Sequence, residues 1–232
     1  LHTAYRRQRQ MCIRDRDWDR WLKIIYDTQP NTRVVATGSA SPALMKGSRE
    51  SGAGRWTVIQ VPTMSFYEYC ELLNLDRPNI ASDLKVTTLL HKSQIERTQI
   101  MMQLSKVQNH FMRYLQVGGF PELALADNDL MAQQIMREDV VDKVLKRDLP
   151  SLYNIRNATE LERIFLYLCN VSSEIVSIEA ITKELNGVSR TTVENYIQYL
   201  ESANLIYQSW PVDMAGKKVL KARPKIYIAD AA

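Results

Sequence analysis

The chain has 232 residues, of which 45% are hydrophobic and 24% are charged, and its formal net charge is +4. This composition is typical of a globular protein with a buried core, and it excludes a disordered or fibrous chain. The charge does not by itself indicate a nucleic-acid partner, because residues 1–16 hold five arginines against one aspartate and the rest of the chain is neutral in sum.

Three cysteines and three histidines lie scattered along the sequence. Their spacing fits neither a disulfide framework nor a zinc site, and it is typical of a protein of the reducing cytoplasm. No uncharged apolar run is long enough to cross a membrane, and no apolar segment follows the basic N-terminus as in a secretory signal. We therefore expect a cytoplasmic protein that has no membrane partner and no metal site of its own.

Residues 1–16 differ from everything that follows, because they have neither helical nor strand periodicity. One interpretation is a basic arm that binds nucleic acid. The other, which we favour, is a leader foreign to the gene, since the string MCIRDR resembles translated remnants of sequencing adapters. That interpretation implies a chain truncated at its N-terminus, and it leaves a truncation at the C-terminus open.

Helix and strand alternate in the next part of the chain. Apolar residues at helical spacing predict a helix over 17–26, and short apolar runs predict strands over 33–36 and 56–61. Ser65, followed three residues later by a glutamate, is a capping-box signature and predicts a helix over 66–73. Strands and helices that alternate over short links favour an α/β domain with a parallel sheet.

The chain then becomes helical. Apolar residues every three to four positions predict helices over 84–91, 95–115 and 130–146. The run Gly118–Pro121 ends the second of these, because glycine is favoured just past a helix and proline cannot continue it. Residues 148–153, which include a proline, are predicted to form a hinge.

The last part has a pattern of its own. Helices are predicted over 158–171, 178–185 and 190–203, and strands over 205–210 and 224–229, joined by a turn that contains glycine and lysine. Three helices followed by a β-hairpin are the outline of a winged helix-turn-helix.

No complete active site can be recognised from motifs. The chain has no G-x-x-x-x-G-K-[S/T] loop to hold phosphates, and no apolar strand ends in Asp-Glu to hold magnesium. Its one Gly-Lys pair, Gly216-Lys217, falls in the predicted turn of the hairpin. Ser-His-Asp, H-E-x-x-H and paired-cysteine arrangements are absent as well.

Five short motifs nevertheless follow one another in a definite order: WDRWLKIIY, VVATGSASP, GRW, PTMSFYE and YLQVGGFPE. Their order and spacing resemble those of prokaryotic AAA-type ATPases that carry a C-terminal winged-helix and restriction-endonuclease-like domain of unknown function. KRDLPSLY, the predicted winged segment and the closing KIYIADA are similar to the same family, so the resemblance covers roughly residues 17–232. In that family the P-loop and the Asp-Glu strand lie upstream of the position of Trp18, where residues 1–16 stand here.

The resemblance implies the C-terminal half of an α/β P-loop NTPase core with a parallel sheet, then an all-helical lid and a winged helix-turn-helix. The implied division is a leader over 1–16, part of the ATPase core over 17–75, the lid over 76–150 and the winged-helix domain over 151–232. The intact protein would bind ATP and Mg²⁺, could form a homo-oligomer, and would couple hydrolysis to a conformational change. This chain, which lacks Walker A and Walker B, is expected to bind neither cofactor and to be inactive alone.

The resemblance also assigns site residues by position. Thr37 and Ser39, in the loop after the first predicted strand, correspond to sensor 1, where a hydroxyl orients the water that attacks the γ-phosphate. Arg55 corresponds to an arginine that contacts the nucleotide phosphates from the same or a neighbouring subunit, and Arg49 is a weaker candidate. The alternatives are an ordinary loop after a strand and a solvated arginine at the start of the next strand.

Five bases with no acid between them lie in the predicted wing: Lys217, Lys218, Lys221, Arg223 and Lys225. They could contact nucleic acid. The third helix, however, carries Arg190 against Glu194 and Glu201, which disfavours entry into a phosphate-lined groove, so we favour a winged helix that packs on protein. Three functions therefore remain open: an ATPase, a DNA-binding or regulatory winged-helix protein, and an interaction module without a ligand.

Overall fold

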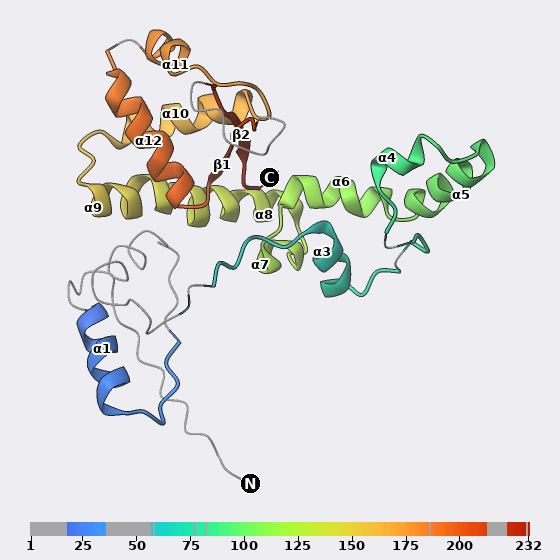
Figure 1. Ribbon diagram of the computed structural model, residues 1–232, viewed down its shortest axis with the longest axis horizontal. Helices are drawn as coiled ribbons and strands as arrows, with labels where there is room; N and C mark the ends of the chain where they lie inside the picture. Colours follow the sequence, from blue (N-terminus) through green and yellow to red (C-terminus); the bar gives the residue numbers. More distant parts are fainter. Residues whose placement is uncertain are drawn as a thin grey trace. The chain divides into compact units, whose positions relative to one another are not determined.

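The computed structural model describes residues 18–35, 57, 59–76, 78–81, 83–185, 187–212, 222–230 and 232 (Figure 1). The chain divides into two compact units, 1–60 and 61–232. In the first unit the described helix is α1, Trp18–Thr28, which confirms the helix predicted over 17–26. None of the helices in the described part of the chain is long and apolar enough to cross a membrane.

The two strands predicted in the α/β part are not seen in the described residues. Residues 33–35 are outside any strand, and so are residues 57 and 59–61. Val35 is 79% exposed and Ile59 is 80% exposed. A strand is held by hydrogen bonds to a neighbouring strand, and no described residue pairs with these segments, so the strand prediction is wrong for them.

The described elements of the second unit are mostly helices. In chain order they are α3 (Phe66–Leu72), α4 (Val86–Leu89), α5 (Gln94–Ser105), α6 (Gln108–Val117), α7 (Pro121–Ala124), α8 (Asp129–Ile135), the π-helical segments η1 (Met136–Asp142) and η2 (Val144–Asp148), α9 (Leu149–Tyr153), α10 (Ala158–Asn170), α11 (Ile178–Glu184), α12 (Arg190–Ser202) and the strands β1 (Ile206–Ser209) and β2 (Lys225–Ile228).

The capping box predicted for α3 is confirmed. The Ser65 hydroxyl accepts a hydrogen bond from the Glu68 backbone N–H at 3.3 Å, and the Glu68 carboxylate accepts one from the Ser65 N–H at 2.8 Å. The helix predicted over 95–115 is wrong in one respect, because it is divided into α5 and α6. Val107 stands between them with its side chain buried, and its N–H donates to Leu104 rather than to the residue four positions back.

A continuous helical run extends from α8 through η1 and η2 to α9. The helix predicted over 130–146 is therefore longer than expected, and the hinge predicted over 148–153 is wrong. Pro150 lies inside this run, directly after the π-helical segment η2, and the helix continues through it to Tyr153. The run ends at Asn154, whose φ of 53° is left-handed.

The three C-terminal helices and the two strands predicted after them are all present. β1 and β2 pair antiparallel, with Ile206 opposite Ile228. Fully buried side chains from every one of these elements form one hydrophobic core: Leu161, Ile164, Leu168, Ile181, Val193, Leu200, Ile206 and Ile226. The apolar residues spaced at helical intervals in the sequence are thus the ones that the fold buries.

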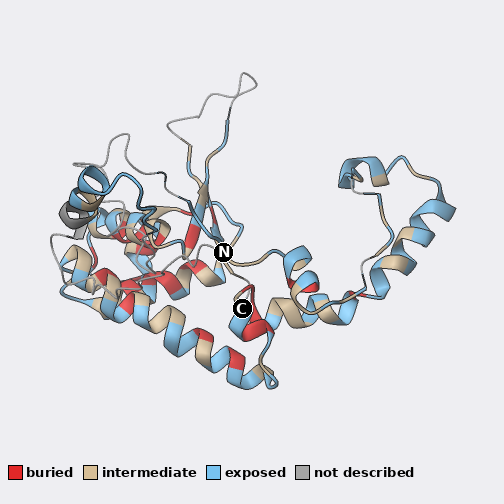
Figure 2. Ribbon diagram, turned by 90° about the horizontal axis from the view of Figure 1, so that it is seen from below, coloured by how far each residue is buried: buried red, intermediate tan, exposed pale blue. Residues whose placement is uncertain are grey.

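A second hydrophobic core lies among α3, α6, α7 and α8 (Figure 2). Its buried members are Tyr69, Cys70, Val117, Leu123, Ala124, Ala132 and Met136. The helical run from α8 to α9 contributes to both cores, since Met136 belongs to this one and Leu145 and Leu149 belong to the other. The boundary predicted between residues 150 and 151 falls inside α9.

The N-terminus of α5 provides a pH-dependent feature. Ser93 and Glu96 form a reciprocal capping box, with the Glu96 carboxylate 2.9 Å from the Ser93 N–H. The hydrogen bond from that N–H, then those from the Ser93 hydroxyl and from Lys92, lower the pKa of Glu96 to about 2. The folded pKa lies below the ordinary value of 4.5, so the cap is fully effective above pH 4.5 and is lost as the pH falls towards 2.

We therefore expect the first turn of α5 to open as the pH is lowered from about 4.5 to about 2. Amide hydrogen exchange at Glu96 measures this opening directly. Glu96→Gln keeps an acceptor but removes the charge, so its exchange should not follow the same pH profile. A Glu96 carboxyl that titrates at its ordinary pKa in an NMR titration would contradict the capping argument.

Candidate functional site

The residues predicted for nucleotide chemistry lie outside the described part of the structure. These are Thr37, Ser39, Arg55 and the weaker candidate Arg49. Of the predicted wing, Lys217, Lys218 and Lys221 lie outside it as well, whereas Arg223 and Lys225 are described. The roles of all these residues stay predictions.

Of the two described bases of the predicted wing, Arg223 lies close to an acidic partner. Glu179 of α11 pairs with Arg190 at 2.9 Å and with Arg223 at 3.6 Å, and Arg190 also pairs with Glu194 at 2.9 Å. Hydrogen bonds from its own backbone N–H and from the Ser177 hydroxyl lower the pKa of Glu179, and the two arginines add to the effect. These pairs are exposed and contribute little stability, but they neutralise the positive charge at the start of α12.

The most tightly built feature of the described residues is a glycine junction, which we define as Met64, Gly118, Gly119 and Asp230. The Gly119 N–H donates to the Asp230 carboxylate at 2.9 Å, and the Gly119 carbonyl accepts from the Met64 N–H at 2.7 Å. One glycine thereby joins the segment before α3 to the segment after β2.

Only glycine fits at the two central positions of the junction. A Cβ at Gly119 would lie 2.4 Å from the Met64 carbonyl oxygen, and one at Gly118 would lie 2.4 Å from the Asp230 Oδ1. Gly118 also has a φ of 78°, which side-chain-bearing residues rarely adopt. In the sequence these glycines are interpreted only as the end of a helix, for which one glycine is enough. The second glycine, Gly119, is the signal that two backbone segments approach each other closely at this point.

Tyr114 also binds the backbone of Met64. Its hydroxyl donates to the Met64 carbonyl at 2.8 Å, so that both polar groups of the Met64 backbone are bonded to α6 or to the turn after it. Burial, and then the charges of Asp230 and Glu68, raise the pKa of the Tyr114 phenol. The phenol thus stays protonated and remains a donor to Met64 over the neutral pH range.

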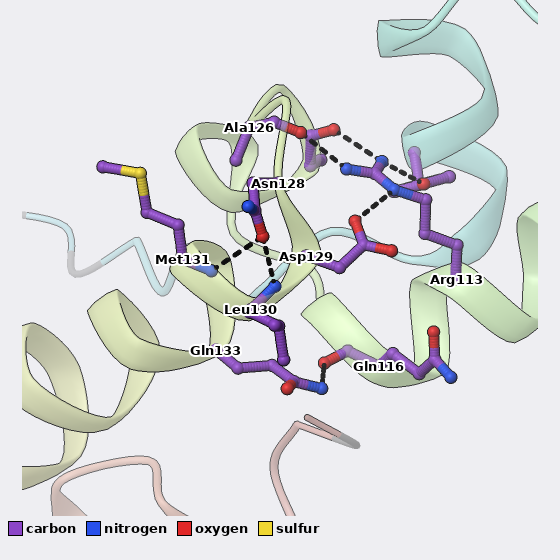
Figure 3. Close-up of polar contacts among 10 residues, drawn as sticks. Arg113, Gln116, Ala126, Asn128, Asp129, Leu130, Met131 and Gln133 are labelled. Atoms are coloured by element: carbon purple, nitrogen blue, oxygen red, sulfur yellow. Dashed lines mark hydrogen bonds and ion pairs between the residues drawn. The ribbon is translucent and has the colours of Figure 1, made fainter.

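Arg113 ties the same elements together from another side (Figure 3). Its guanidinium pairs with Asp129 at 2.8 Å and donates to the Tyr69 hydroxyl at 2.9 Å. It also donates to the carbonyls of Ala124 at 2.9 Å and Ala126 at 2.8 Å. A guanidinium with four such bonds is fixed in place and has a structural role, because its donors are directed at protein groups.

Nearby hydrogen bonds fix α8 against α6 (Figure 3). Asn128 caps α8 by accepting from the N–H groups of Leu130 and Met131, at 2.9 and 3.3 Å. The Gln133 side chain donates to the Gln116 carbonyl at 3.1 Å. The junction, Arg113 and these contacts join α3, α6, α7 and α8 into one connected body.

Comparison with known protein families gives this geometry a context. Residues 12–70 match the AAA domain, so the N-terminal part of the chain is similar to AAA-type proteins. Residues 108–232, more than half of the chain, match a family described as domain of unknown function DUF8612, and the chain belongs to that family. Met64 and Tyr69 lie in the AAA match, whereas Arg113, Gly119 and Asp230 lie in the other.

Several curated relatives are similar over most of the chain. The uncharacterized protein MJ1544 of Methanocaldococcus jannaschii is 28% identical over 195 residues, which are 82% of this chain and 40% of the relative. An uncharacterized protein of Haemophilus influenzae is 24% identical over 216 residues, which are 90% of this chain and 47% of the relative. The chain thus spans less than half the length of these relatives. No solved structure matches.

Proposed function

We propose that the intact protein is an AAA-type ATPase in which ATP hydrolysis moves the DUF8612 part through the glycine junction. The match of residues 12–70 to the AAA domain supports an ATPase-like class. The observation that carries the proposal further is that Met64, in the AAA match, is bonded through both its N–H and its carbonyl to residues of the DUF8612 part.

A second contact supports the same coupling. The Tyr69 hydroxyl, from the AAA match, accepts a hydrogen bond from Arg113, and Arg113 is in turn held by the α7–α8 turn. Buried side chains of α3 share a core with those of α6, α7 and α8. Interiors are close-packed and transmit displacement rather than absorbing it, so a shift of the segment before α3 would carry α6 with it.

The nucleotide chemistry rests on the family resemblance. ATP and Mg²⁺ would be held by a P-loop and an Asp-Glu strand upstream of this chain's α1. Thr37 and Ser39 would orient the attacking water, and Arg55 would stabilise charge on the transferring phosphoryl group.

For the three C-terminal helices and the hairpin we propose a winged helix that packs on protein. Arg190 and Arg223 share the carboxylate of Glu179, and Arg190 is further neutralised by Glu194. Bases that are already paired gain less from phosphate contact, because each ion pair must first be broken.

Titration calorimetry with ATP-Mg tests the proposal on two forms of the protein. The 232-residue chain is expected to show no micromolar binding, since its sequence contains no G-x-x-x-x-G-K-[S/T] loop to cradle the phosphates. The chain extended upstream through its own reading frame is expected to bind ATP-Mg in the micromolar range. Micromolar binding by the shorter chain, or none by the extended one, would contradict the proposed arrangement.

A further inference from the structure

The α4–α5 region forms a helical arm, which we define as residues 85–106. None of the residues of α4 or α5 is buried, as Figure 2 shows. Six large apolar side chains of the arm are 47–80% exposed: Val86, Leu90, Ile95, Met101, Met102 and Leu104. The arm lies between the AAA and DUF8612 matches and belongs to neither.

This exposure is unusual for such side chains. The apolar residues of α5 do not lie on one stripe, since Met101, Met102 and Leu104 point in different directions around the helix. A helix that is apolar on several sides is ordinarily buried. An exposed apolar patch rimmed by charge is characteristic of a surface that binds another protein.

The charge of the arm indicates what kind of surface it binds. The arm carries Lys85, Lys92, Arg97 and Lys106 against a single acid, Glu96. Glu96 is already paired with Lys92 at 3.1 Å, which leaves the remaining bases without an acid of the arm to balance them. The complementary surface must therefore be both apolar and acidic.

The same chain carries a surface of that kind. We define the α7–α8 surface as residues 122–131, in which Leu125, Leu130 and Met131 are 58–76% exposed. Glu122, Asp127 and Asp129 are its charged residues, and it contains no base. Glu122 and Asp127 are exposed, and Asp129 is paired with Arg113.

The two surfaces are separated within one copy. The arm precedes the first turn of α6, whereas the α7–α8 surface is held at Arg113, in the second half of α6, through Ala124, Ala126 and Asp129 (Figure 1). Among the described residues no ion pair or hydrogen bond joins the arm to the α7–α8 surface of the same copy.

We propose that the helical arm of one copy of this chain docks on the α7–α8 surface of a second copy. The exposed leucines and methionines of the two surfaces pack together, and the bases of the arm face Glu122 and Asp127. The contact uses two different surfaces and is therefore heterologous, so it repeats from copy to copy into a closed ring or an open chain. The proposal does not depend on ATP chemistry.

A charge exchange between the two surfaces tests the contact. The first variant, Lys85→Glu with Arg97→Glu, makes the arm acidic at positions near helix N-termini, where acids are tolerated. The second, Glu122→Lys with Asp127→Lys, makes the α7–α8 surface basic. Sedimentation velocity should show that the natural chain associates in the micromolar range. Each variant alone should need an about tenfold or higher concentration to associate, because like charges then face each other.

Mixing the two variants is the decisive step, since opposite charges face each other again and association should return. The control variant, Arg163→Glu with Lys183→Glu, changes the net charge by the same amount as the first variant, but at exposed positions of α10 and α11. It should associate like the natural chain. Met101→Gln with Met102→Gln should weaken association without a charge change. Circular dichroism verifies the fold of every variant.

Three results with the natural chain and the two charge variants would each overturn the proposal. They are a natural chain that stays monomeric through the micromolar range, single variants that associate like the natural chain, and a mixture that associates no better than its components. The first of these would mean that the arm is covered by some other partner. Equal loss of association in the α10–α11 control would also overturn it, because net charge rather than the arm would then decide assembly.

Discussion

Gly119→Ala is expected to lower the free energy of unfolding of the 61–232 unit by about 3 kcal/mol, a large effect for a single added methyl group. The added Cβ would lie 2.4 Å from the Met64 carbonyl oxygen and 2.9 Å from the Met64 nitrogen. Both are backbone atoms and cannot rotate aside as a side chain would. The clash is relieved only by breaking the bond between the Met64 N–H and the Gly119 carbonyl. Urea unfolding followed by circular dichroism measures the loss.

Gly187→Ala is the matched control. Gly187 has a φ of 100° but no atom within 4 Å of an added Cβ, so this change costs backbone strain alone, about 1–2 kcal/mol. Hydrogen exchange of the Met64 amide gives a second, local readout, which should accelerate in Gly119→Ala and not in Gly187→Ala. Equal stabilities for the two variants, with unchanged exchange at Met64, would show that the junction is not tightly packed.

Arg55→Ala is expected to slow ATP hydrolysis by the upstream-extended protein by about 10³-fold or more while changing its affinity for ATP little. An arginine that contacts the transferring phosphoryl group acts mainly on the transition state, where charge develops. Ser39→Ala should slow hydrolysis less, because it removes one orienting hydrogen bond from the attacking water. Steady-state ATPase assays and ATP titrations measure the two effects separately.

Arg49→Ala serves as the comparison for Arg55, since Arg49 is the weaker candidate for the same role. If the large loss falls on Arg49 instead, the arginine assignment moves to that position. If Arg55→Ala and Ser39→Ala both stay within about twofold of the natural rate with folding intact, these are ordinary surface residues, which seldom affect rate.

Local pattern in the sequence was sufficient for the C-terminal part of the fold. Leu161, Ile164 and Leu168 recur at helical spacing, and the fold buries all three. Capping signatures marked the start of α3 in the same way, through Ser65 and its glutamate. Such features are read correctly because each depends on residues only three or four positions apart.

Features that depend on tertiary contact were not predictable. The break between α5 and α6 occurs where Val107 is buried, and burial cannot be read from a pattern that is apolar on both sides of the break. Pro150 suggested a hinge, yet the helical run continues through it. Nothing in the sequence pattern indicated that Asp230 accepts a hydrogen bond from Gly119, because the two residues are 111 positions apart.

That separation has a consequence for the order in which the protein folds during synthesis. The core of α3, α6, α7 and α8 draws its buried residues from Tyr69 to Met136, and these leave the ribosome well before Asp230 does. Contacts that close long loops form late, because their loop-closure entropy must be met first. The nascent chain therefore completes that core while the Gly119 N–H still binds water, and Asp230 replaces the water once β2 has paired with β1.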